Sequence, residues 1–172
     1  MTESYLYAKI AQDSLGYVWL NNRTFTTPNQ KERLKMIVNR VRGDIFAAPQ
    51  KHIAFAVNTQ GYNDAGFAGQ VSSRIWPKLA STGGNELGEV LTHKNGAKTF
   101  HALVCHSLDS GGWNDTPRVA RECLDKIDVP ADEEIAVVLM GSGPIGMMQG
   151  ADVNAILAGM EQSKRKLVVY TR

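Results

Sequence analysis

Short runs of apolar residues recur from residue 53 onward, and each is about as long as one β-strand. The runs are Ile53–Val57, Phe100–Cys105, Ile135–Met140 and Leu167–Tyr170. A strand with apolar residues at successive positions has both faces buried, which is typical of a sheet covered by helices on either side. The runs therefore predict four strands in the interior of a domain.

Apolar residues at helical spacing appear between some of these runs. One such stretch covers residues 68–75 and ends before Pro77, because a proline disfavours helical geometry in the residue that precedes it. A second helix is predicted from Thr116 as N-cap, with Pro117 at the first helical position. A third begins near Asp152. Strands that alternate with helices predict an α/β fold with three layers, α/β/α.

The N-terminal part has a different pattern. Apolar and polar residues alternate within residues 5–25, and the polar break at 13–16 predicts a β-hairpin. Residues 36–38 are β-branched enough for a strand, although the polar residues before them could open a helix, and periodicity leaves both open. We therefore predict a short N-terminal β extension, residues 1–34, packed on a mixed-sheet domain, residues 35–172.

Composition narrows the class of protein. The chain has 172 residues, of which 43% are hydrophobic and 21% charged, as expected for a globular domain. Its net charge of +2, without blocks of like charge, gives no electrostatic reason for nucleic-acid binding. No apolar run approaches the length of a membrane span, and no signal peptide is evident. Cys105 and Cys123 form no CxxC motif, so we predict a cytoplasmic protein without a metal or cofactor.

Two glycine-containing segments are candidates for a binding site. One, residues 58–69, follows the first apolar run and leads into a helix; the other, residues 141–147, follows the third run. In α/β sheets, ligands gather where strands end and backbone N–H groups are open, and glycine lets a phosphate approach the main chain. Two such segments side by side suggest a diphosphate. The alternative is that each is only a tight turn, since neither matches a P-loop or a complete GxGxxG unit.

The order of several short motifs resembles that of a macro domain, an α/β/α module that binds ADP-ribose. The motifs are Gly43-Asp44-Ile45, a strand ending near Asn58, a glycine segment entering a helix, Gly88-Glu89-Val90 and Gly141-Ser142-Gly143. The closing residues 166–171 are similar to the last strand of one branch of that family. This branch holds the terminal ADP-ribose protein glycohydrolase and the ADP-ribose-1″-phosphate phosphatase. The resemblance covers about residues 37–172.

The resemblance implies roles for residues on both sides of a ligand. Asp44 would accept a hydrogen bond from the adenine amino group, Ile45 would lie beside the base, and Asn58 would lie near the distal ribose. Two sets of residues would surround the diphosphate and the distal ribose: Gly66, Phe67, Ala68 and Gly69 in the first, and Ser142, Gly143, Pro144, Ile145 and Gly146 in the second. The partner would be ADP-ribose or an ADP-ribosylated macromolecule, and a nucleic acid only where it is that macromolecule.

The same resemblance also marks departures from the glycohydrolase. His106 stands where that enzyme has a nucleophilic lysine, and Pro144 or Ile145 stands near its catalytic aspartate, so the covalent lysine mechanism is not expected here. Asp64, Asp109 or His106 would then serve as a general base. His106, at its ordinary pKa, would make a rate rise through roughly pH 6–7, although simple packing of this histidine is the favoured interpretation.

We therefore predict a chain that binds ADP-ribose or a derivative and could hydrolyse it from a target. The alternatives are a non-catalytic module that sequesters an ADP-ribose-type nucleotide and an ADP-ribose-1″-phosphate phosphatase. Residues 107–112 resemble a loop of the phosphatase branch that borders the site.

Overall fold

The computed structural model describes residues 11–12, 18–19, 39–81, 83–109 and 111–171. The chain divides into two units, residues 1–34 and 35–172. In the first unit, β1 (Ala11–Gln12) and β2 (Val18–Trp19) pair antiparallel, as the hairpin pattern predicts. Residues 36–38 lie outside the described residues, and the packing of the first unit on the second stays a prediction.

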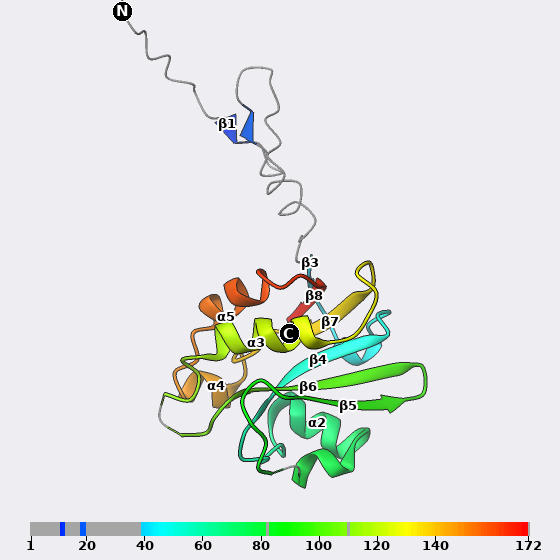
Figure 1. Ribbon diagram of the computed structural model, residues 1–172, viewed down its shortest axis with the longest axis vertical. Coiled ribbons are helices and arrows are strands. Elements are labelled where there is room, and N and C mark those ends of the chain that lie inside the picture. Colours follow the sequence, from blue (N-terminus) through cyan, green and yellow to red (C-terminus); the bar gives the residue numbers. More distant parts are fainter. Residues whose placement is uncertain (1–10, 13–17, 20–38, 82, 110, 172) are drawn as a thin grey trace, which may run out of the picture. The chain divides into compact units, whose positions relative to one another are not determined.

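The larger unit is built on a six-stranded mixed sheet. Its strands are β3 (Asn39–Arg42), β4 (His52–Asn58), β5 (Val90–Asn95), β6 (Lys98–His106), β7 (Glu134–Val138) and β8 (Lys166–Thr171), in the order β3-β8-β7-β4-β6-β5. Neighbouring strands are parallel except β5, which runs antiparallel to β6 after a tight turn. Because the parallel strands all end at one edge, segments far apart in sequence meet there (Figure 1).

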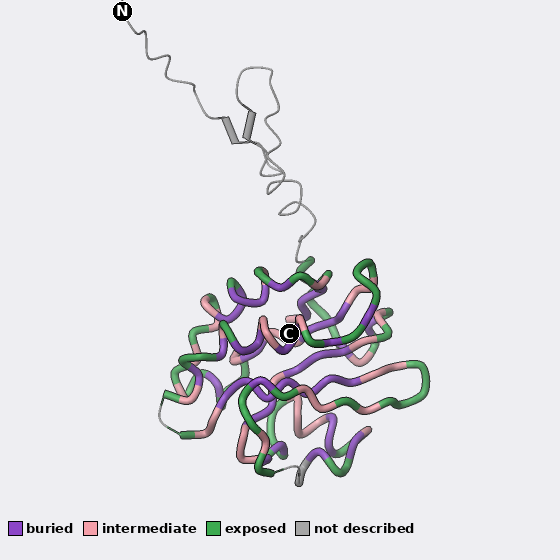
Figure 2. The backbone as a smooth tube through the Cα atoms, viewed as in Figure 1, coloured by how far each residue is buried: buried purple, intermediate pink, exposed green. Residues whose placement is uncertain are grey.

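The four predicted strands correspond to β4, β6, β7 and β8, and their interiors are buried. The sequence pattern missed β5 because its side chains are only half-buried or exposed, as expected of an edge strand with few apolar residues. Figure 2 shows the same contrast, with buried positions concentrated on the central strands.

Helices cover both faces of this sheet. They are α2 (Gly66–Arg74), α3 (Thr116–Lys126), α4 (Pro144–Met148) and α5 (Val153–Met160), with two 3-10 turns, η1 (Ile45–Ala47) and η2 (Pro77–Ser81). One hydrophobic cluster joins α3 and α5 to the strand residues of one face, including Leu103 and Ile135. The other joins α2, η1 and η2 to the opposite face, including Phe55 and Phe100. The predicted three-layer α/β/α architecture is confirmed.

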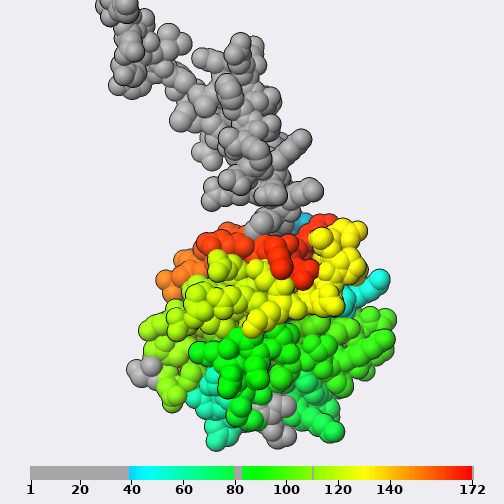
Figure 3. Space-filling view, in the orientation of Figure 1, coloured from blue at the N-terminus to red at the C-terminus, as the bar shows by residue number. Residues whose placement is uncertain are grey.

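Helices α3 and α5 pack closely, and the space-filling view shows them side by side at the surface (Figure 3). A Cβ at Gly159 would lie 2.2 Å from the carbonyl oxygen of Pro117, so only glycine permits this approach. The N-cap of α3 is Asp115 rather than the predicted Thr116. The Thr116 hydroxyl is buried and donates instead to the carbonyl oxygen of Cys105, 2.8 Å away, which ties the helix to β6.

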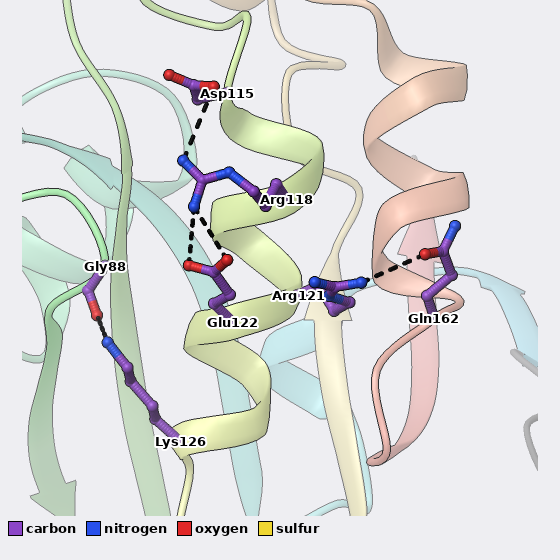
Figure 4. Close-up of polar contacts among 7 residues, drawn as sticks. All are labelled: Gly88, Asp115, Arg118, Arg121, Glu122, Lys126 and Gln162. Atoms are coloured by element: carbon purple, nitrogen blue, oxygen red, sulfur yellow. Dashed lines mark hydrogen bonds and ion pairs between the residues drawn. The ribbon is translucent and has the colours of Figure 1, made fainter.

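The outer face of α3 is polar (Figure 4). Arg118 and Glu122 form an ion pair at 2.9 Å, one turn apart. Lys126 donates to the carbonyl oxygen of Gly88 at 2.7 Å, and Arg121 contacts Gln162 at 3.4 Å. These contacts link α3 to the segments before β5 and after α5. Within the described part of the chain, no helix combines the length and apolar character that a membrane span requires.

Candidate functional site

A cavity of about 1090 Å³ opens at the edge where the parallel strands end. Segments that follow β3, β4, β6 and β7 line it, which is the place predicted for a ligand in an open α/β sheet. The lining includes most of the residues that the sequence singles out for binding: Asp44, Ile45, Asn58, Gly66, Phe67, Ala68, Ser142, Gly143, Pro144, Ile145 and Gly146. Gly69 lies outside it. A Cβ at Gly69 would meet the carbonyl oxygen of Asp64 at 2.5 Å, so this glycine allows close packing of α2 on the preceding turn.

The first glycine segment differs from the expected loop, because Gly66–Gly69 already forms the first turn of α2. No side chain caps this helix, and its first hydrogen bond to the preceding turn runs from the Gly69 N–H to the Ala65 carbonyl. The N–H groups of Gly66, Phe67 and Ala68 therefore have no partner within the helix. These three residues line the cavity, so the start of α2, the positive end of its helix dipole, borders it.

The second segment is a turn followed by the short helix α4, so Pro144–Gly146 is helical rather than loop. Gly141 has φ +75°, and a Cβ there would lie 2.8 Å from the Ala151 Cβ, so the turn requires glycine. Gly143 differs, since a Cβ built on it meets no atom within 4 Å and its φ of −78° suits any residue. The backbone at Gly143 is therefore open to the cavity without being needed for the fold.

Asn58, at the end of β4, holds the turn that follows. Its side-chain amide donates to the carbonyl oxygen of Tyr62 at 2.8 Å and accepts from the N–H of the same residue at 3.1 Å. Both groups of the buried amide are thus engaged in fixing the backbone of Tyr62, whose ring is exposed. This bracing explains why asparagine stands at this position, and contact of Asn58 with a distal ribose stays a prediction.

The end of the cavity near β3 combines a carboxylate, two aromatic rings and an arginine. One carboxylate oxygen of Asp44 accepts from the Phe46 N–H at 3.0 Å and so caps η1. The rings of Phe46 and Phe67 stack with centroids 4.9 Å apart, and the Arg74 guanidinium lies 4.3 Å from the centroid of Phe46. The sequence interpretation missed Phe46 and Arg74, since nothing in the local pattern connects the residue after a turn with the last residue of α2.

His106, the last residue of β6, lines the cavity and is buried. Its ring stacks on Trp113 with centroids 3.9 Å apart, and the Trp113 indole N–H donates to Gln149 at 2.9 Å. Burial lowers the pKa of His106 to about 4, so the imidazole is neutral at physiological pH. The expected rise in rate through pH 6–7 therefore does not apply to this group. Its Nδ1 is buried and has no partner among the described residues.

The two candidate acids lie in different surroundings. Asp64 is exposed and lines the cavity. The Asp109 carboxylate lies outside the lining and accepts from the Ser107 hydroxyl at 2.9 Å and from Gln60 Nε2 at 3.2 Å. Gln60 also accepts from the Leu108 N–H at 3.1 Å and thereby links the segment after β4 to the segment after β6. The structure thus brings Asp64 and His106 to the cavity and uses Asp109 to hold a loop.

The two cysteines and His101 lie outside the cavity lining. Cys105 and Cys123 are buried free thiols whose pKa values burial raises, that of Cys123 to about 11. His101 is buried and in hydrogen-bond contact with His52 at 3.0 Å. The described residues that line the cavity include Arg42 and Arg74 but no lysine. No group of three or more His, Cys, Asp or Glu in the described part of the chain is arranged to hold a metal ion.

Comparison of structures shows which class of fold this is. A macrodomain protein from Streptomyces coelicolor matches with a TM-score of 0.57 and 15% identity, over 78% of this chain and 98% of that one. An Oceanobacillus iheyensis macrodomain mutant, solved with ADPR, matches with a TM-score of 0.57 and 16% identity, over 78% and 86%. An alphavirus P23pro-zbd structure matches with a TM-score of 0.54 and 14% identity, over 77% of this chain, which spans 21% of that protein.

No protein-family model and no curated protein sequence matches the chain. The structural likenesses establish that the chain has the macrodomain fold. The resemblance seen in the sequence is thus confirmed at the level of the fold. Assignment to the branch of the terminal glycohydrolase stays a prediction.

Proposed function

We propose that this chain binds ADP-ribose or a close derivative in the cavity at the carboxyl edge of its sheet. The observation that carries the proposal is the meeting of two glycine-containing backbone segments, Gly66–Ala68 and Gly141–Gly143, in one cavity of about 1090 Å³, with open space beside Gly66 and Gly143. That volume lies slightly above the usual range for small-molecule sites, roughly 300–1,000 Å³, and suits an extended dinucleotide-like ligand.

The diphosphate would lie against these two segments. Three N–H groups without helical partners at the start of α2 offer hydrogen bonds to phosphate oxygens, and the helix dipole adds to them. Gly143 lets the ligand reach the main chain of the other segment. Arg42 and Arg74, which also line the cavity, would offset part of the negative charge.

The adenine would lie at the end near β3. The second carboxylate oxygen of Asp44 would accept from the adenine amino group, while the first caps η1. The stacked rings of Phe46 and Phe67 offer an apolar surface for a flat base. The ADPR in the Oceanobacillus macrodomain structure supports this choice of ligand.

Asp64 supports a second candidate function, hydrolysis of an ADP-ribosyl linkage or of ADP-ribose-1″-phosphate. The exposed carboxylate of Asp64 lines the cavity, where it could act as a general base toward a water molecule. General-base catalysis typically raises a reaction rate by about 10²–10⁴-fold. His106 is neutral and buried, and the described residues of the lining include no lysine for a covalent adduct.

The free buried cysteines suit a reducing compartment such as the cytoplasm.

Calorimetric titration of the protein with ADP-ribose tests the proposal. We expect saturable binding by the natural sequence and none by Gly143→Glu, because the new side chain projects into the cavity and brings a negative charge toward the diphosphate. Gly143→Ala is the matched control and should retain most of the affinity. Absence of saturable heat at millimolar ADP-ribose, with folded natural protein, would refute the proposal.

Turnover is measured separately, as release of ADP-ribose or phosphate from labelled substrates. If the protein is an enzyme, Asp64→Asn should lose turnover while retaining ligand binding. If it is a sequestering module, no product appears with either protein. Trapping of a lysine adduct with borohydride would contradict the assignment of the site.

A further inference from the structure

Two arginines at the end of the cavity near β3 have no polar partner within the described part of the chain. Arg42 is the last residue of β3 and Arg74 the last residue of α2, and both are exposed and line the cavity. Neither forms an ion pair or a side-chain hydrogen bond with another described residue. The other arginines in that part of the chain all have such a partner: Glu161 for Arg40, Glu122 for Arg118, Gln162 for Arg121, and the carbonyl oxygen of Val129 for Arg165.

Arg74 is held in place by an aromatic ring. Its guanidinium carbon, Cζ, lies 4.3 Å from the centroid of the Phe46 ring. A guanidinium that lies over a ring still has N–H groups at its edges, and these form a planar fork that matches phosphate oxygens. Contact with Phe46 thus positions Arg74 without using its hydrogen-bond donors.

Arg74 lies beside the adenosine half of the proposed ligand. Phe46 is one of the two rings proposed to lie against adenine, and Arg74 contacts it directly. The N–H groups proposed for the diphosphate lie at the other end of α2, about 12 Å from Arg74 along the helix axis at a rise of about 1.5 Å per residue. An anion that contacts Arg74 directly would therefore belong to the adenosine half.

The adenosine half of ADP-ribose has no charge to match these arginines. Adenine is neutral at physiological pH, its amino group is assigned to Asp44, and the ribose next to it bears hydroxyl groups. Asp44 is a single carboxylate beside two guanidinium groups, and one of its oxygens already caps η1. A phosphate ester on that ribose would supply the missing negative charge, and dinucleotide-binding folds use an arginine in this way for a ribose 2′-phosphate.

We infer that Arg42 and Arg74 bind a phosphate on the ribose next to adenine, so that the ligand is ADP-ribose phosphorylated at the 2′- or 3′-hydroxyl of its adenosine. This inference rests on the proposed function, since it takes the position of adenine from it.

Calorimetry with three ligands tests the inference: ADP-ribose, and ADP-ribose with a phosphate at the 2′- or at the 3′-position of its adenosine. The natural protein should bind one of the two phosphorylated ligands about tenfold more tightly than ADP-ribose, because hydrogen bonds between charged groups are stronger than those to a neutral hydroxyl. The comparison of the two shows which hydroxyl carries the phosphate. Both arginines are exposed, so this gain should decrease at high ionic strength.

Variants of the arginines locate the phosphate. Arg42→Gln and Arg74→Gln should each reduce the gain, and the double variant should bind all three ligands with nearly equal affinity. Arg40→Gln is the matched control: it removes the same charge from the same strand, but Arg40 pairs with Glu161 and lies outside the cavity lining, so the gain should persist.

The possible failures are distinguishable. A gain that persists in the double variant, or an equal loss of affinity for all three ligands, would overturn the inference, since the arginines would then not hold the added phosphate. Binding of ADP-ribose by the natural protein without a gain for either phosphorylated ligand would overturn the inference and leave the proposed function standing. No binding of any of the three ligands would refute both.

Discussion

Asp44 illustrates how one side chain can serve both the fold and the ligand. One carboxylate oxygen caps η1 through the Phe46 N–H, and the other is assigned to the adenine amino group in the proposed complex. Asp44→Asn keeps a side-chain oxygen for the cap but removes the charge of the acceptor. We expect it to fold with unchanged stability and to bind ADP-ribose roughly tenfold more weakly, by calorimetry, because hydrogen bonds to charged groups contribute about 1.5–3 kcal/mol.

Asp44→Ala separates the two roles further. It removes the cap as well, so the free energy of unfolding should fall by about 1 kcal/mol in addition to the loss of affinity. If Asp44→Asn binds ADP-ribose normally and only Asp44→Ala loses stability, Asp44 has a capping role alone.

At the residue scale, the sequence identifies residues that line the cavity where these residues are neighbours in the chain. Gly43, Asp44 and Ile45 stand together in a motif and line the cavity, whereas their contact with an adenine base stays a prediction. Arg74 and Trp113 also line it, but each reaches the cavity only through tertiary packing: Arg74 by its position against Phe46, and Trp113 by stacking on His106. Burial of His106, which changes its expected titration, is likewise a property of the folded chain that the sequence around it does not show.

At the element scale, strands were easier to predict than short helices. An unbroken apolar run indicates a strand that is buried on both faces. Four such runs correspond to β4, β6, β7 and β8. The sequence pattern predicts a loop where α4 lies, because five residues are too few to show a helical period, and two of them are proline and glycine. The three-layer order followed from the alternation of elements, whereas the antiparallel edge strand β5 did not.

The turn between β7 and α4 gives a stability prediction at this scale. Gly141→Ala should lower the free energy of unfolding by about 2–3 kcal/mol, because its φ of +75° is unfavourable for alanine and the added Cβ would lie 2.8 Å from the Cβ of Ala151. Gly143→Ala, two residues along, should leave stability unchanged. Urea unfolding of both variants is the measurement, and equal stability would mean that the turn tolerates a side chain at Gly141.

At the scale of the whole molecule, the parallel sheet collects the ends of distant strands into one site. The segments after β3, β4, β6 and β7 are separated by many residues, yet all line the same cavity. At this edge His106 is buried and stacks on Trp113, and both residues line the cavity. Burial of this histidine favours its neutral form, which connects the stability of the fold to pH.

Burial of the histidines predicts how stability depends on pH. Burial lowers the pKa of His106 to about 4, and burial together with the neighbouring His52 lowers that of His101 to about 4. Histidine in the unfolded chain titrates near 6.5, so between about pH 6.5 and 4 the unfolded state binds more protons than the folded state. The free energy of unfolding should therefore fall as the pH is lowered through this window, by at most about 1.4 kcal/mol per pH unit for each histidine. His106→Phe keeps a ring against Trp113 and removes one titrating group. The free energy of unfolding of this variant should therefore fall less steeply with decreasing pH, by the contribution of one histidine. Urea unfolding at pH 7.5, 6 and 5 measures the difference. The same slope in the variant and the natural protein would show that His106 is protonated in the folded state as readily as in the unfolded chain.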